Sequence, residues 1–143
     1  MSFSETISPF LGRCALVWFF GAAAMNIVSD WPHVAAGLEA RHVPLAPAVL
    51  LVALVLIFLG CISLFFGYHT RHGAVLLFGL TIVAAFALHP VWTMADGAGR
   101  EGEFAIFSRD LAICGGLLLL VGMGPGPFAI DNRAKGGGKG KKH

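Results

Sequence analysis

Four long apolar segments, separated by short polar stretches, dominate the chain. They cover about residues 10–28, 47–67, 73–92 and 106–124, and the second contains no charged residue. A helix rises about 1.5 Å per residue, so about 20 apolar residues are needed to cross a bilayer core that is about 30 Å thick. The pattern therefore predicts an all-α, polytopic membrane protein built as a four-transmembrane-helix bundle.

The polar connections between these segments differ in character. Residues 29–46 contain Pro32 and Pro44, each of which disfavours helix at the residue before it, so we expect a short extramembrane excursion there. Residues 68–72 leave room only for a tight hairpin, which makes the second and third helices antiparallel neighbours. Residues 95–103 combine three glycines with four charges and are expected to lie in water.

Composition agrees with the segment pattern. The 143 residues are 57% hydrophobic and 13% charged, with a mean hydropathy of +0.78, whereas a soluble domain carries about 25% charge. We expect a single membrane domain over residues 1–128, in contact with the lipid bilayer, and a flexible basic tail over residues 129–143. The net charge of +2 comes almost wholly from that tail, which argues against nucleic acid as a partner.

The distribution of Lys and Arg predicts the orientation, because cytoplasmic flanks are enriched in them. With the N-terminus inside, the other side of the membrane receives only Arg41, Arg100 and Arg109. The first residues carry Glu5 and no basic start, unlike a cleavable signal peptide, so the first apolar segment should be retained. We therefore expect both termini in the cytoplasm. The basic residues on that side are Arg13, Arg71, Arg133, Lys135, Lys139, Lys141 and Lys142.

Polar side chains form two layers when the four spans are drawn antiparallel. Arg13 and Arg71 lie at the cytoplasmic edge, where long side chains reach water or head groups, and we expect them to act as anchors. The outer layer is the better candidate for a site, because polar groups at membrane depth are costly and often functional. This layer also contains Asn26, Trp31 and His33, and its candidate site residues are Asp30, His89, Trp92, Arg109 and Asp110.

His89 is the member of this layer with the most versatile chemistry. An imidazole near its ordinary pKa can exchange protons or bond a carbonyl, for instance that of a quinone at the membrane edge. The alternative is that His89, followed by Pro90, meets only helix-end carbonyls and interfacial water. Arg109 and Asp110 could likewise be purely structural, and Trp92 could belong to an interfacial aromatic belt.

The sequence shows no motif of a hydrolase, a nucleotide-binding protein or a metalloenzyme. Its three cysteines lie in apolar runs without a CxxC pair, and its histidines are irregularly spaced, so we expect no metal site. Small residues let membrane helices approach closely, and Gly21, Gly60, Gly115 and Gly116 are expected to lie at helix contacts. The alternative is that these small-residue faces form the contacts of a homo-oligomer.

Several short fragments of the chain together form a recognisable series. They are LGR at Arg13, DWP at 30–32, HVPLA at 42–46, GYHTRHGA at 67–74, HPVW at 89–92, and FSRDLAICGGLLLLVGMGPGPFAID at 107–131. In this order the fragments resemble the DoxX family of small bacterial membrane proteins. Two departures from that family are Ile27 and Leu56, at positions often occupied in relatives by a lysine and a glutamate. The resemblance implies a four-helix fold in the bacterial inner membrane and an association with membrane redox systems.

Together these observations favour a non-catalytic accessory or interaction subunit, docked beside a membrane oxidoreductase complex. The alternative is a quinone-linked oxidoreductase component whose site lies at the periplasmic membrane edge. A small-solute transporter is less supported, because the second span has no ionisable group and the chain shows no inverted repeat.

Overall fold

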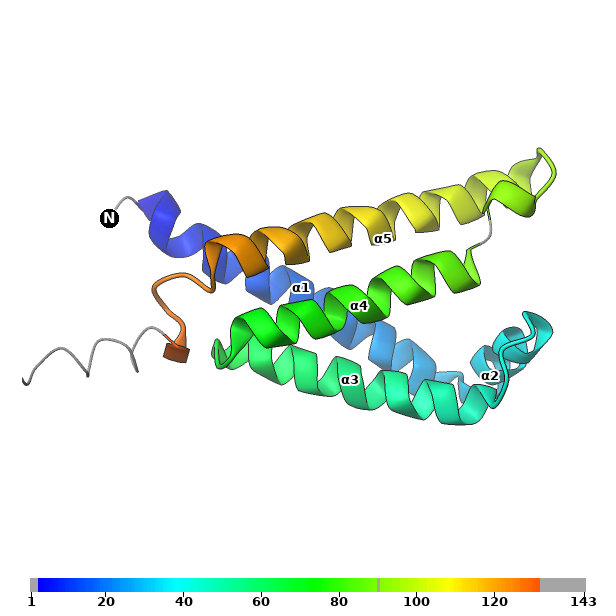
Figure 1. Ribbon diagram of the computed structural model, residues 1–143, viewed down its shortest axis with the longest axis horizontal. Helices are drawn as coiled ribbons and strands as arrows, with labels where there is room; N and C mark the ends of the chain where they lie inside the picture. Colours follow the sequence, from blue (N-terminus) through cyan, green and yellow to red (C-terminus); the bar gives the residue numbers. More distant parts are fainter. Residues whose placement is uncertain (1–2, 90, 132–143) are drawn as a thin grey trace, which may run out of the picture.

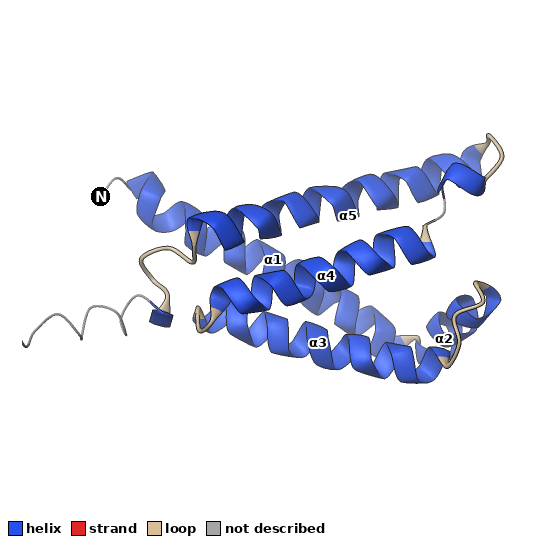
Figure 2. Ribbon diagram, in the orientation of Figure 1, coloured by secondary structure: helices blue, strands red, loops and turns tan. Residues whose placement is uncertain are grey.

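The computed structural model describes residues 3–89 and 91–131, and these residues form helices and loops without a strand (Figures 1 and 2). The elements are α1 (Phe3–Ser29), α2 (Trp31–Ala40), α3 (Ala46–Phe66), α4 (Thr70–Leu88), the 3-10 turn η1 (Val91–Thr93) and α5 (Ala98–Met123). Four segments are long and apolar enough to cross a membrane: Ile7–Ser29, Ala46–Phe66, Thr70–Thr93 and Gly99–Met123. The predicted all-α, four-span membrane bundle is confirmed.

Two of the connections contain more helix than the sequence suggested. The excursion after the first span forms α2, because Pro32 lies in its first turn, where no backbone N–H is needed for the helix. The polar stretch after the third span is helical from Ala98, with Glu101 in the first turn, where the helix dipole favours an acid. The fourth helix therefore begins well before residue 106.

The long helices lie in the order α1, α3, α4, α5, with α2 at the end of the molecule away from the termini (Figure 1). α1 packs along α3, and α4 packs between α3 and α5, but α1 and α5 touch each other little. The bundle is therefore open on one side. Its buried core is formed by Phe20, Ile57, Leu64, Ala74, Leu77, Leu117 and Leu120.

Only some of the small residues lie at helix contacts. A Cβ at Gly60 would lie 2.4 Å from Leu77, and one at Gly73 would lie 2.3 Å from the Ser63 hydroxyl, so α3 and α4 meet on glycines. A Cβ at Gly21 or Gly115 would meet no described atom within 4 Å. The structure therefore places Gly60 as expected, while Gly21 and Gly115 face open space.

Candidate functional site

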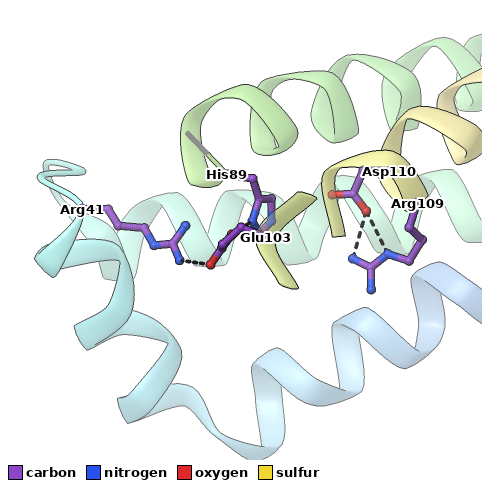
Figure 3. Close-up of polar contacts among 5 residues, drawn as sticks. All are labelled: Arg41, His89, Glu103, Arg109 and Asp110. Carbon is purple, nitrogen blue, oxygen red and sulfur yellow. Dashed lines mark hydrogen bonds and ion pairs between the residues drawn. The ribbon is translucent and has the colours of Figure 1, made fainter. Parts of the chain in front are cut away.

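A cluster of three charged or ionisable side chains joins the helices at the end away from the termini (Figure 3). Glu103 of α5 pairs through Oε2 with Nδ1 of His89, and its Oε1 accepts a hydrogen bond of 3.3 Å from Nη2 of Arg41. We call Arg41, His89 and Glu103 the Glu103 cluster. Because Arg41 ends α2 and His89 ends α4, one carboxylate ties three elements together.

Glu103 and Arg41 were not predicted as site residues, because residues 95–103 were expected to lie in water and residues 29–46 were expected to form an extramembrane excursion. With α5 starting at Ala98, Glu103 lies on the same helix face as the buried residues Asp110, Cys114 and Leu117, at spacings of seven, four and three residues. Those spacings keep side chains on one face of a helix. The continuation of this apolar face back to Glu103 was the signal that could have identified it.

A second charged pair lies deeper, on α5. Nε and Nη2 of Arg109 both donate to Oδ1 of Asp110, at 3.1 and 2.9 Å. Asp110 is buried, and the Arg109 guanidinium lies toward α1, 5.2 Å from the centre of the Phe19 ring (Figure 3). Six to seven residues separate this pair from Glu103, or roughly 10 Å along the helix, so it lies at membrane depth. Pairing is what makes such charges tolerable there.

The other two predicted members of the outer layer lie apart from these groups. Asp30 pairs at 3.2 Å with His33, three residues on, and both side chains are largely exposed. Trp92 packs against Phe86 and Phe107 with ring centroids 5.7 and 6.2 Å apart, and remains exposed on its outer side. The predicted members therefore lie in four separate arrangements rather than in one site.

At the opposite end, near the termini, Arg13 is buried rather than extended into water. Only 2% of its surface is exposed, and its Nη1 lies 3.4 Å from the Leu64 carbonyl oxygen, which accepts its hydrogen bond. Gly67 makes the space, because a Cβ there would lie 2.4 Å from that Nη1. Nε of Arg13 has no hydrogen-bond partner among the described residues. Arg71, by contrast, is exposed.

Asp131 fastens the end of the described chain to the hairpin between α3 and α4. Its carboxylate accepts hydrogen bonds from the backbone N–H of His69 and Thr70, at 2.8 and 3.0 Å, and from the Thr70 hydroxyl. Its own N–H donates to the Gly67 carbonyl at 3.0 Å. Burial opposes ionisation, but these donated hydrogen bonds outweigh it and hold the pKa of Asp131 below its ordinary value. These contacts attach the described chain to the bundle as far as Asp131, and the rest of the predicted tail, residues 132–143, lies outside the described residues.

These features define a polytopic membrane protein with paired charges at one end and a buried arginine at the other. The model of the SURF4 family matches residues 48–136. The chain is 30% identical over 129 residues to the inner membrane protein YqjF of Escherichia coli, covering 89% of this chain and 92% of that protein. The chain belongs to the SURF4 family.

A eukaryotic relative agrees with this assignment. The Surfeit locus protein 4 homolog of Schizosaccharomyces pombe is 32% identical over 80 residues, which are 52% of this chain and 25% of that protein. No solved structure matches the chain significantly.

The resemblance to the DoxX family is wrong, because the SURF4 model covers the segments at 67–74, 89–92 and 107–131, on which that resemblance depended. Those fragments are glycine turns and helix ends, which recur in unrelated membrane hairpins for the same steric reasons. The expected association with redox systems came only from that resemblance and is not carried further. The quinone hypothesis for His89 stays a prediction; Glu103 occupies Nδ1 and leaves Nε2 for such a contact.

Proposed function

We propose that this protein is a non-catalytic interaction protein of the inner membrane, and that its partner binds the end away from the termini. The observation that carries the proposal is the Glu103 cluster, which holds α2, α4 and α5 in one arrangement at that end. Glu103 bonds to Arg41 and His89 at once, and these charge-assisted contacts fix the ends of α2 and α4 against α5. The cluster therefore holds the surface at this end in one shape.

The surface beside the cluster has the composition of a protein contact site. Trp92 and Phe104 are exposed, Phe86 and Phe107 support the Trp92 ring, and Arg41 lies at the rim. Aromatic and arginine side chains supply most of the binding energy in protein interfaces. The similarity to a protein named for the inner membrane supports that location for this chain as well.

The test is site-specific photo-crosslinking in living cells. A photoreactive phenylalanine analogue replaces Phe104, and a matched control replaces Phe58, a residue of the apolar span α3 that is similarly exposed (57% and 66%). The proposal expects a discrete protein adduct from position 104 that is absent at position 58 and weakened by Glu103→Gln. Lipid adducts alone at both positions would contradict it.

A further inference from the structure

A groove between α1 and α5 runs along the open side of the bundle, at the end that carries the termini. It has a volume of about 420 Å³, within the range of about 300–1,000 Å³ typical of small-molecule sites. Its walls include Gly12 and Leu16 from α1 and Ala112, Ile113 and Gly116 from α5. A Cβ at Gly116 would lie 4.0 Å from Leu16, so the two helices face each other here without interlocking.

The length of this groove matches one leaflet of a bilayer. It extends along α5 from Met123 to Ala112, which is roughly 16 Å at the helical rise, and half of a hydrocarbon core is roughly 15 Å. One turn beyond Ala112 and Leu16, the contact between Arg109 and Phe19 bridges the two helices and closes the deep end. The groove therefore has the dimensions of an acyl chain that enters from the leaflet on the side of the termini.

The mouth of the groove is positively charged. Arg13 lines it, and the side chain is buried with its Nε lacking a partner among the described residues. Gly124 also lines it, and a Cβ on Gly124 would lie 3.8 Å from Nη2 of the exposed Arg71. Asp131 is the acid that interacts electrostatically with Arg13, but its carboxylate already accepts hydrogen bonds from the backbone N–H groups of His69 and Thr70. Guanidinium groups match phosphate geometry, so this mouth complements an acidic head group.

A larger hollow, of about 540 Å³, lies between α3 and α4 near Tyr68 and His72. The Ser63 hydroxyl that lines it already donates to the Tyr68 and His69 carbonyls. Among the described residues that line this hollow, no buried polar side-chain atom lacks a hydrogen-bond partner, whereas Nε of Arg13 in the other groove does. The groove between α1 and α5 is therefore the stronger candidate for a ligand site.

We propose that the groove between α1 and α5 binds one acidic phospholipid, with an acyl chain between the helices and the phosphate at Arg71 and Arg13. Arg71 makes the first contact at the surface, and the Arg13 side chain turns toward the groove so that Nε gains an acceptor. This site lies at the opposite end from the proposed partner surface and does not depend on it, so either proposal can fail alone.

The experiment is native mass spectrometry of the purified full-length protein after exchange into mild detergent. The protein is titrated with phosphatidylglycerol or phosphatidylcholine of the same chain length. We expect one phosphatidylglycerol to be retained per chain, in preference to phosphatidylcholine. Gly116→Leu fills the groove and should lower retention about tenfold or more, because several methylene contacts are lost. Gly115→Leu, next to it but in open space, should leave retention unchanged.

Arg71→Gln tests the head group separately, because Arg71 is exposed and its replacement leaves the helix core intact. It should remove the preference for phosphatidylglycerol while a chain is still bound. Equal retention of both lipids by the unaltered protein would overturn the proposal. Equal effects of Gly116→Leu and Gly115→Leu on lipid retention would also overturn it. Undiminished retention in Gly116→Leu would do the same, and this is the result expected if a partner helix rather than a lipid occupies the groove.

Discussion

Individual polar residues in this protein are placed by contacts that span long stretches of sequence. Arg41 and Glu103 are 62 residues apart, and Arg13 and Leu64 are 51 residues apart. The apolar pattern shows that such residues lie near membrane edges, but a partner's identity depends on the rotation of each helix about its axis. His89 could therefore be proposed as a site residue from the sequence, whereas its pairing with Glu103 could not be predicted.

Glu103→Gln should destabilise the protein by roughly 1 kcal/mol, because it removes the charge that holds Arg41 and His89 in a partly exposed network. Thermal unfolding in detergent measures the effect. Glu101→Gln is the control, because Glu101 is an exposed acid two residues earlier on the same helix, and its replacement should cost only the smaller stabilisation that the helix dipole gives an acid in the first turn. Equal shifts in the two variants would show that the cluster contributes nothing specific.

Asp131 should give the protein an acid-sensitive contribution to stability. Its folded-state pKa is lowered, so the stabilisation is present above the unfolded-state value of about 3.9 and is lost as pH falls through the folded-state pKa. Asp131→Asn should therefore flatten the loss of stability below about pH 4. Unfolding midpoints measured across the acid range test this, and superimposable profiles for the two proteins would refute it.

At the scale of elements, α3 and α4 approach each other closely at glycines. The five-residue connection predicted a hairpin, and Gly67 and His69 adopt positive φ angles of 67° and 51° to make it. Gly60 and Gly73 then allow Leu77 and Ser63 to approach the facing helix. Small residues in a sequence indicate that close contact is possible, and the crossing of the helices decides which of them lie at a contact. Gly21 and Gly115 do not lie at one.

Gly73→Ala should destabilise the hairpin by about 1–3 kcal/mol, because the new Cβ overlaps the Ser63 side chain. Gly79→Ala lies nearly two turns further along the same helix and meets no described atom within 4 Å, so it should be neutral or slightly stabilising. Thermal stability of the two variants in one detergent gives the comparison. A Gly73→Ala protein as stable as the Gly79→Ala protein would contradict the close contact between α3 and α4.

For the whole molecule, four spans place the two ends of the fold on the same side of the membrane (Figure 1). The seven basic residues on that side, against three on the other, make the cytoplasm the expected location. The Glu103 cluster would then face the periplasm, and the groove between α1 and α5 would open to the cytoplasmic leaflet.

A fluorescent protein fused after His143 should therefore be fluorescent, and alkaline phosphatase fused at the same point should be inactive. Each reporter works on only one side of the membrane, so the pair gives opposite signals. Insertion of the same reporters after Gly97, in the loop before α5, should reverse both results and serves as the control. Active phosphatase at His143 would invert the proposed orientation.

The sequence by itself determined that this is a membrane protein with four spans and a tight central hairpin. These properties depend on the length and hydrophobicity of continuous segments, because lipid requires each span to bond its own backbone and expose apolar side chains. Only the tertiary structure decided that Glu103 joins Arg41 to His89, that Arg13 is buried beneath Gly67, and that α1 and α5 leave a groove between them. Those outcomes depend on helix register and crossing, which distant parts of the chain set together.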